Sequence, residues 1–581
     1  MTGGSASVPR FERSFDTSEH RLTRIGDGEL GGKAAGLREV EAHILSRIAA
    51  DEFPGVEIAI PRAVVLTTEV FDAFVGRNRL ERVADGDPSD ADIAHAVQQA
   101  ELPAAFVGDL RALTADLHRP LAVRSSSLLE DALDHPFAGV YGTKMIPNND
   151  IEADARFRRL VEAIKFVFAT TFFAESRDYL RSVGRQPGDE KMAVLIQEVV
   201  GQRRNDRFYP CLSGVARSHN FYPTGHARAT DGVVTLALGL GKTIVDGGLS
   251  WSYAPPYPKA PPPFNDIGDL MKNTQTSFWA IHMGEPPPHD PVRETEYLVQ
   301  RPLADAEDDR ALRYLVSTYD PGSDRLNAGL DRHGPRVLTF APLIGSRFVP
   351  FTGAVERLLE VSAEVLESPV EIEFAVNLDR DDLIPIRLGY LQVRPMMVAT
   401  GGVEITADDL TSERTVVASH HALGNGRLDD ITDVVFVPPD AFDPAATHDM
   451  AAELERVNRR LMADGRRYLL LGFGRWGTSD ARLGIPVVWG QISGARTIVE
   501  ATLPDVNPEL SQGSHFFHNL LANRVLYLSV QHDGPSTIDW DWFGGLPEVE
   551  RHRFVRHVRT AEPLEVRVDG GSGTGVIRRH A

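Results

Sequence analysis

The chain has 581 residues, of which 42% are hydrophobic and 25% charged, a composition typical of soluble, folded proteins. At roughly 100–200 residues per domain, this length predicts three or four domains. The formal net charge of -21 argues against nucleic acid or an anionic membrane as a partner, because an acidic surface repels both. It does not exclude ATP, because a local basic pocket and a metal ion can invert the field.

The cysteine content and the lengths of the apolar runs exclude further kinds of protein and of site. Cys211 is the single cysteine, so no intramolecular disulfide and no cysteine-based metal site is expected. No run of about 18 apolar residues could span a membrane. Residues 1–18 are mostly small or polar and lack the apolar centre of a signal peptide, so we expect a flexible tail there and a cytoplasmic location.

The first half of the chain alternates helical and strand-like segments. Residues 43–75 predict a helix, a turn, a strand over 63–66 and a second helix capped by Thr67 or Thr68. Residues 151–182 carry apolar side chains at three- and four-residue steps, which predicts a helix. The apolar run 191–200 predicts a strand, although Gln197 and Glu198 interrupt it near its end.

The second half continues this alternation. Residues 232–248 predict a strand followed by a glycine-rich turn, and the proline-rich segment 254–266 predicts an extended loop. Residues 370–396 predict a hairpin, and a composition shift at 399–415 indicates a domain boundary.

A further unit follows that boundary. Its predicted elements are strands over 434–439, 468–472 and 484–490 and a helix over 449–465. The last thirty residues contain GGSGTG, which predicts weak order.

Arg124 stands near the end of a hydrophobic strand in LAVRSSS, residues 121–127, and Glu130 and Asp131 follow it. A fixed cation beside hydroxyl and backbone donors suits a phosphate group. The alternative is an ordinary strand end with a buried structural ion pair.

Lys33 lies in GGKAAGL, residues 31–37, where small residues allow close approach of a ligand and the lysine can neutralise phosphate. The spacing is not that of a Walker loop. Gly241-Lys242-Thr243 also lacks the earlier glycine that such a loop requires. The alternative for GGKAAGL is a helix N-terminus with a surface lysine.

Polar pairs mark the predicted hairpin. Glu371 and Glu373 lie on one side of a strand because side chains alternate, and Mg²⁺ would relieve their repulsion. Gln392 and Arg394 likewise share a face, where the arginine could grip a phosphoryl group. The alternatives are a solvated acidic face and an edge strand with polar residues pointing outwards.

Taken in order, several segments resemble the N-terminal nucleotide-binding region of the phosphoenolpyruvate synthase and pyruvate phosphate dikinase family. They are GGKAAGL, AVRSSSLLED, FAGVYGT, VLIQEVV, LSGVARS, GLGKTIVDGG, EIEFAV and LQVRP, and they lie within about residues 25–400.

The resemblance implies an α/β (α+β) chain with a two-lobed ATP-grasp region that clamps ATP and Mg²⁺, followed by a C-terminal α/β domain. We therefore predict a tail over 1–18, lobes over 19–210 and 211–400, a C-terminal domain over 401–545 and a C-terminal tail over 546–581.

The resemblance implies roles for the residues of this sequence that match the family's motifs. Lys33 and Arg124 would contact phosphates, and Thr143 is a lesser candidate beside them. The strand end formed by Gln197, Glu198, Val199 and Val200 would face adenine, although an ordinary buried strand is the alternative.

The metal and the transferring group involve the hairpin. The resemblance implies that Glu373 and Gln392 hold Mg²⁺ and that Arg394 stabilises charge on the transferring phosphoryl group. Glu371 stands where relatives often carry aspartate, so it is the weaker metal candidate.

The sequence also departs from the family. It has no Thr-Ser-His element, and residues 401–581 are too few for a (β/α)₈ barrel of about 250 residues. The phosphoryl acceptor therefore stays open: a small molecule, a histidine of the C-terminal unit, or a partner protein that supplies missing parts. Nucleotide binding without turnover, in a regulatory or scaffold protein, is the alternative.

The C-terminal unit offers weaker candidates. Arg475 lies beside Trp476 in GRWG and could bind an anionic or planar ligand, although the residues that follow could simply cap the next segment. His515 and His518 are three residues apart and could bind a metal, accept a phosphoryl group or simply pack. LGIPV, residues 483–487, resembles part of the family's swivelling domain and suggests a degenerate version of it.

Overall fold

The computed structural model describes residues 8–13, 20–128, 130, 140–182, 185, 190–221, 223, 226–260, 267–272, 274–330, 333–346, 349–378, 386–396, 398, 403–478, 480–504, 520 and 525–580. The chain forms two compact units, and each is described by itself. The first unit comprises Met1–Asn220, Thr224–Ile244 and Leu249–Met396; the second comprises Phe221–Pro223, Val245–Gly248 and Met397–Ala581. None of the helices in these described ranges has the length and apolar character needed to cross a membrane.

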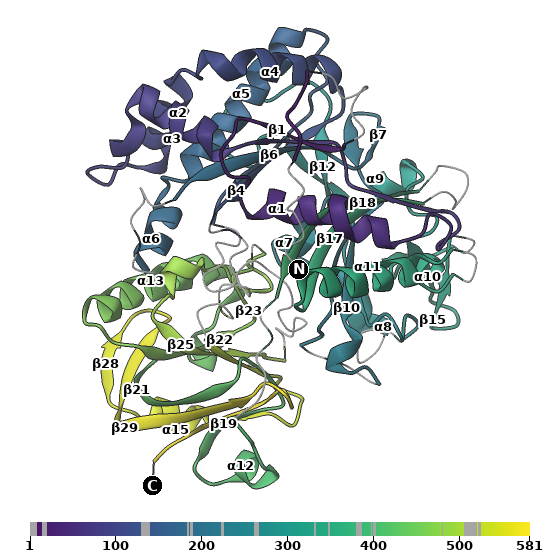
Figure 1. Ribbon diagram of the computed structural model, residues 1–581. Coiled ribbons are helices and arrows are strands. Elements are labelled where there is room, and N and C mark those ends of the chain that lie inside the picture. Colours follow the sequence, from purple (N-terminus) through teal and green to yellow (C-terminus); the bar gives the residue numbers. More distant parts are fainter. Residues whose placement is uncertain are drawn as a thin grey trace. The chain divides into compact units, whose positions relative to one another are not determined.

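The first sheet of the first unit has five strands in the order β1-β3-β6-β4-β5. They are β1 (Leu22–Ile25), β3 (Ala63–Leu66), β6 (Met192–Glu198), β4 (Leu121–Ser127) and β5 (Thr143–Ile146). The helices beside it are α2 (Thr68–Asn78), α3 (Asp90–Gln99), α4 (Ala104–Asp116), α5 (Ala153–Thr170) and α6 (Ala174–Ser182) (Figure 1). The mixed α/β class predicted from the sequence is confirmed.

Two local predictions can be compared with this sheet. The strand over 63–66 and a helix beginning after Thr67 are confirmed. The helix predicted over 151–182 is instead two helices, α5 and α6. Phe172 N donates to Ala169 O and Phe173 N to Thr170 O, and this tightened last turn ends α5 before α6 begins.

The second sheet has six strands in the order β11-β10-β9-β17-β18-β2. They are β11 (Trp251–Tyr253), β10 (Val233–Leu238), β9 (Leu212–Arg217), β17 (Val370–Leu378), β18 (Ile386–Pro395) and β2 (Val56–Ala59). β17 and β18 are antiparallel, which confirms the predicted pairing of residues 370–396; the intervening residues 379–385 lie outside the described ranges.

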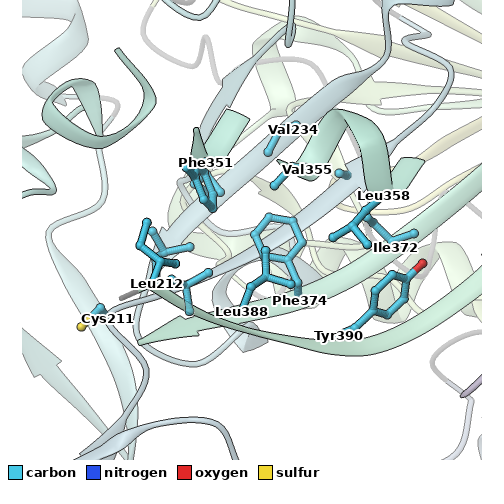
Figure 2. Packing of buried hydrophobic residues seen from close by; sticks show 14 of the residues in the cluster. Cys211, Leu212, Val234, Phe351, Val355, Leu358, Ile372, Phe374, Leu388 and Tyr390 are labelled. Atoms are coloured by element: carbon cyan, nitrogen blue, oxygen red, sulfur yellow. The ribbon is translucent and has the colours of Figure 1, made fainter. Parts of the chain in front are cut away.

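Helix α11 (Phe351–Leu366) packs its apolar side against this hairpin (Figure 2). Phe351 meets Phe374 edge-on with ring centroids 6.2 Å apart, and Leu358 and Tyr390 are fully buried in the same cluster. Burial of each such side chain contributes about 1.5–3 kcal/mol, so the strands that carry the polar pairs have a firm apolar backing.

Smaller elements complete the first unit. One sheet has the order β13-β12-β8-β7 and another the order β15-β14-β16. Their strands are β13 (Leu298–Pro302), β12 (Ser277–His282), β8 (Arg207–Tyr209), β7 (Gln202–Arg204), β15 (Arg325–Ala328), β14 (Val316–Asp320) and β16 (Arg336–Leu338). The short helices are α7 (Lys242–Val245), α8 (Ile267–Lys272), α9 (Leu303–Asp308) and α10 (Ala341–Ile344).

Helix α1 (Gly32–Glu39) lies against both large sheets, and two glycines make this possible. A Cβ on Gly31, where φ is +74°, would lie 1.6 Å from the carbonyl oxygen of Ser126 in β4. A Cβ on Gly36 would lie 2.6 Å from the carbonyl oxygen of Val393 in β18. No larger residue fits either close approach, so GGKAAGL holds the ends of β4 and β18 near one helix.

The second unit is built on a ten-stranded sheet with the path β20-β26-β25-β22-β21-β29-β30-β19-β27, and β28 pairs with β29. The strands are β19 (Thr415–Ser419), β20 (His421–Leu423), β21 (Gly426–Phe436), β22 (Tyr468–Phe473), β25 (Ala495–Ala501), β26 (Leu526–Val530), β27 (Thr537–Ile538), β28 (Glu548–Arg551), β29 (Arg556–Asp569) and β30 (Thr574–Arg578). β21, β22, β25 and β26 run parallel. The helices are α12 (Ala407–Thr411), α13 (Thr447–Ala463) and α15 (Trp540–Gly544).

Two predictions for this unit are wrong. The tail expected over 546–581 contains β28, β29 and β30, because β29 buries Leu564, Val566 and Val568, β30 buries Val576 and Ile577, and Gly573, at φ +67°, makes the turn between them. The strand expected over 484–490 is only β24 (Gly484–Ile485), which pairs with β23 (Arg475–Trp476). A short helical turn follows at Trp489–Gln491.

Candidate functional site

Arg124 connects the two large sheets of the first unit. It is the fourth residue of β4, directly opposite Thr143 of β5. Its Nη2 donates to Glu373 Oε2 at 3.0 Å and to Gln392 Oε1 at 2.8 Å, and its Nη1 donates to the carbonyl oxygen of Leu391 at 3.5 Å. Residues that lie about 250 positions or more from Arg124 in the sequence therefore meet it at the middle of β4.

The same contacts define a position that favours a positively charged group. Glu373 Oε2 and Gln392 Oε1 both point at one guanidinium nitrogen. The Arg124 and Glu373 side chains keep 13% and 15% of their surface exposed, so the pair borders solvent rather than lying deep in the core. An exposed edge of this kind lets a ligand compete for the same partners.

The two oxygens also fit the chemistry of Mg²⁺. Carboxylate and amide oxygens are its usual protein ligands, and it commonly takes only one or two of them, with water and phosphate oxygens completing the shell. The guanidinium now holds the position between them, as a cation would. Within the part of the chain that the structure describes, no group of three or more acidic, histidine or cysteine side chains forms a metal cage, so Glu373 and Gln392 would need phosphate oxygens to complete the site.

Arg394 and Glu371 form a different arrangement on the same hairpin. Arg394 Nε donates to Glu371 Oε1 at 2.9 Å, and its Nη2 contacts the same oxygen. Arg217 Nε of β9 lies 2.6 Å from Glu371 Oε2. With 2% of its surface exposed, Glu371 joins two arginines, which favours a positioning role for it over a metal-binding one.

Lys33 lies beside the second half of β4 and has another partner. Its ammonium forms an ion pair with Glu130 and lies 3.4 Å from Ser125 Oγ. The Lys33 and Glu130 side chains are 9% and 3% exposed. Lys33 is therefore not the surface lysine of the alternative interpretation; it is a buried cation that a carboxylate neutralises.

The predicted adenine-binding residues lie at the end of β6: Gln197 and Glu198 are its last two residues, and Val199 and Val200 come directly after it. Gln197 is opposite Ala122 and is 2% exposed, and its Nε2 has no hydrogen-bond partner among the described residues. Glu198 occupies the opposite face, where burial raises its pKa although three arginines act against this. Val199 N donates to the carbonyl oxygen of Pro120 at 2.8 Å.

An apolar cluster adjoins this strand end. Val199 and Ala122 pack there with residues of β8, β12 and β13 and the segment between them; the buried members are Ala122, Val199, Phe208, Leu240, Ile281, Met283 and Leu298. A flat heterocycle needs such apolar walls together with a few polar groups.

The C-terminal candidates are not gathered into one described site. Arg475 is 7% exposed, and its Nη1 donates to the carbonyl oxygen of Gly247 at 2.6 Å, a residue of the same unit. Thr478 Oγ1 accepts from Asp480 N at 3.2 Å, which supports the capping alternative for this segment. His515 and His518 lie outside the described residues.

Three residues around the site were missed by sequence reasoning: Arg217, Glu130 and Glu190. Arg217 precedes a serine in LSGVARS as Arg124 does in AVRSS, and that parallel is a signal that could have identified it. Glu130 was noted in the motif but given no role. Glu190 precedes β6 in an unremarkable polar stretch, so only the fold reveals it.

Comparison with known proteins agrees with the first unit's motifs. A family model described as the pyruvate phosphate dikinase AMP/ATP-binding domain matches residues 28–414. No curated protein matches the chain. The family match confirms the resemblance inferred from the motifs.

Proposed function

We propose that this chain, which belongs to the family of the pyruvate phosphate dikinase AMP/ATP-binding domain, is an ATP- and Mg²⁺-dependent phosphotransferase. The observation that carries the proposal is the convergence of Glu373 and Gln392 on the guanidinium of Arg124. Phosphoryl transfer depends mainly on positioning and on neutralisation of charge. A cation beside two oxygens of the kind that bind Mg²⁺ is the arrangement that such chemistry needs.

The roles follow from the contacts. Arg124 would turn from its protein partners to the phosphate oxygens, while Glu373 and Gln392 would hold Mg²⁺, which when bound neutralises charge on those oxygens. Arg394 would contact the transferring phosphoryl group. Glu371 and Arg217 keep its guanidinium in one orientation, and such pre-organised cations stabilise developing charge without reorganisation.

The base would lie at the end of β6. The backbone of Gln197, Glu198, Val199 and Val200 would meet the edge of adenine, and the neighbouring apolar cluster would cover its faces. The buried amide nitrogen of Gln197, which has no hydrogen-bond partner among the described residues, supports a polar ligand at this position.

The acceptor is a separate part of the proposal. A small molecule, a histidine of the second unit and a partner protein are each compatible with the site. Transfer of one phosphoryl group would leave ADP, whereas dikinase-type cleavage would leave AMP with phosphate or pyrophosphate.

Nucleotide analysis of the full chain tests the function. Incubation with ATP and Mg²⁺, with and without candidate acceptors, should convert ATP to ADP or AMP, and chelation of Mg²⁺ should abolish this. Arg124→Ala should lose the activity, whereas Arg203→Ala, which removes an exposed arginine of the same unit, should keep it. Absence of ATP binding in the presence of Mg²⁺ would overturn the proposal.

One observation favours a second candidate, a regulatory or scaffold protein that binds ATP without turnover. Arg124 and Lys33 are both neutralised by carboxylates of the chain itself. For that candidate ATP would bind, Arg124→Ala would weaken the binding, and no acceptor would yield product.

A further inference from the structure

Arg217 is the last residue of β9, and its side chain belongs to a charged row beside the candidate site. In the antiparallel sheet Arg217 is directly opposite Glu371 of β17, and Glu371 is directly opposite Arg394 of β18. Directly paired residues project from the same face of a sheet, so the three side chains form a row across three strands. Ile372 alternates to the other face, where it belongs to the apolar cluster beneath α11 (Figure 2).

Glu371 is shared between the two arginines of this row. Arg217 Nε lies 2.6 Å from Glu371 Oε2, and Arg394 Nε donates to Glu371 Oε1 at 2.9 Å. All three side chains are buried. One carboxylate charge is therefore divided between two buried cations, an arrangement that favours a further anion next to them.

The guanidinium of Arg217 also has a donor that the described residues leave unused. Its Nη2 is buried and has no hydrogen-bond partner among them. On the other side of β9, Val233 of β10 is opposite Arg217 and has no acceptor in its side chain. A buried charged donor without an acceptor is costly, and an oxyanion is the partner that a guanidinium binds best.

The backbone next to Arg217 is held in place. Ser218 N donates to the carbonyl oxygen of Val370 at 3.0 Å, and Val370 N donates to Ser218 Oγ at 2.8 Å. This reciprocal pair fixes the end of β9 against β17, while Glu371 sets the orientation of the guanidinium. Donors that are fixed in this way bind an anion without reorganisation.

The row lies next to the residues that we propose to hold Mg²⁺. Glu373 and Gln392 are opposite each other, two residues along β17 and β18 from Glu371 and Arg394 and on the same face. Two residues along a strand cover about 7 Å. Adjacent phosphate groups of one polyphosphate can span this distance, with one group on the metal and the next on the arginines.

We infer that Arg217 is a phosphate-binding residue, whose Nη2 donates to the terminal phosphoryl group of a nucleoside triphosphate beside Arg394. The inference rests on the proposed function for the identity of the anion. It goes beyond that function because Arg217 becomes a direct ligand of the nucleotide as well as a support for Arg394. It also gives the site a preference for triphosphates, since a diphosphate bound in the same way ends before the row.

The binding of two nucleotides to the full chain tests this contact. Calorimetry with saturating Mg²⁺ gives the Kd of a non-hydrolysable ATP analogue and the Kd of ADP. In Arg217→Met the analogue should bind about 10–100-fold more weakly than in the wild type, the effect of losing a hydrogen bond to a charged group. The Kd of ADP should change by less than about twofold. Arg217→Lys should weaken the analogue less than Arg217→Met does, because it keeps the charge but loses the planar fork.

Arg177→Met is the matched control. Arg177 of α6 is a buried arginine of the same unit that pairs with one carboxylate, Asp87, and its Nε also lacks a partner among the described residues. Its other contacts are with the carbonyl oxygens of Phe172 and Pro88. Its replacement should change the Kd of either nucleotide by less than about twofold.

The outcomes separate this inference from the proposed function. An unchanged Kd of the analogue in Arg217→Met, or equal weakening of the analogue and ADP, would overturn the inference and leave the function standing. Circular dichroism shows whether Arg217→Met is folded. If it is not, the same comparison is made in Arg217→Lys, where an unchanged ratio of the two Kd values would refute the inference. If the wild type binds neither nucleotide, the function itself is overturned.

Discussion

Two polar networks, one in each unit, use the same residue types differently. In the first unit, Glu373 meets Arg124 at a border with solvent and shares that cation with an amide oxygen. In the second unit, Asp433 is 1% exposed and accepts from His557 Nε2 at 2.7 Å, Arg559 Nε at 3.0 Å and Arg466 Nε at 2.6 Å. In the first network the arginine and the carboxylate both border solvent, whereas in the second the shared carboxylate and the histidine are buried and only the arginine side chains reach solvent.

The tautomer of His557 follows from its two hydrogen-bond partners. Arg460 Nη2 lies 2.8 Å from His557 Nδ1, and an arginine can only donate, so Nδ1 accepts and Nε2–H donates to Asp433. Both ring nitrogens are engaged inside the network, and the histidine is 1% exposed. Such an arrangement stabilises a fold, whereas the arrangement at Arg124 is the one for which we propose nucleotide and metal binding.

The largest expected effect comes from breaking the network at Arg124. Arg124→Ala should lower MgATP-dependent turnover by about 10²–10³-fold, the usual loss when one pre-organised electrostatic group is removed. Arg124→Lys should recover part of it, because the charge is kept but the fork geometry is lost. Steady-state kinetics measures both, and circular dichroism should show the fold unchanged. Full activity in Arg124→Ala would place the site elsewhere.

Breaking the network at Asp433 should lower stability instead. Asp433→Ala should lower the free energy of unfolding of the second unit by about 1–3 kcal/mol, because it leaves the buried Nε2–H of His557 without its acceptor. Denaturant titration measures this. MgATP affinity should stay at the wild-type value, and a change larger than about twofold would contradict the separation of roles.

The same network predicts behaviour in acid. Hydrogen bonds from His557, Arg466 and Arg559 outweigh burial and hold the pKa of Asp433 well below its usual range. A depressed carboxyl pKa adds stability at pH values above the unfolded pKa of about 3.9, and this is lost as pH falls through the folded value. Stability of the wild type should therefore drop below about pH 4 more steeply than that of Asp433→Asn.

Glu371 gives a smaller and more discriminating test. Glu371→Gln removes the charge that joins Arg217 and Arg394 but keeps an acceptor, so a loss of about 1–3 kcal/mol in stability is expected. If Glu371 positions Arg394 rather than holding the metal, the Mg²⁺ concentration for half-maximal turnover should not change. An increase of tenfold or more in that concentration would make Glu371 a ligand after all.

The smallest effect concerns Glu190 and has the opposite sign. A buried carboxyl with a pKa raised to about 7 favours the folded state at low pH and penalises it as pH rises from the unfolded pKa through 7. Glu190→Gln should thus unfold at a higher temperature than the wild type at pH 8 but not at pH 5. Equal melting temperatures at both pH values would deny the raised pKa.

Several helices and strands could be predicted from the sequence, and the reason differs from one element to the next. Strand 63–66 and the hairpin of β17 and β18 were predictable because apolar periodicity and turn residues are local signals. The convergence of Arg124, Glu373 and Gln392 was predictable because they stand in recognisable motifs, and their roles in binding ATP and Mg²⁺ stay predictions. The partner of each residue was not predictable, since contacts 249 residues apart depend on the fold of the whole unit.

Where prediction failed, the cause was a contact between residues that lie far apart in the sequence. The glycine run in residues 546–581 predicted a tail. Instead, β29 pairs with β21 and β30 pairs with β19. The local periodicity of a sequence does not show which distant strands will pair. Lys33 could be either a surface or a phosphate-binding residue, and only the burial of Glu130 beside it shows that it is neutralised within the chain.

The most direct test of the central claim is a count of bound metal. Mn²⁺, which accepts the same oxygen ligands as Mg²⁺, can be titrated by electron paramagnetic resonance into the full chain with a non-hydrolysable ATP analogue. The wild type and Glu364→Ala, which removes an exposed carboxylate of α11, should each bind Mn²⁺ with the nucleotide, and Glu373→Ala should lose it. Undiminished Mn²⁺ binding in Glu373→Ala would contradict a metal–nucleotide site at Arg124, Glu373 and Gln392.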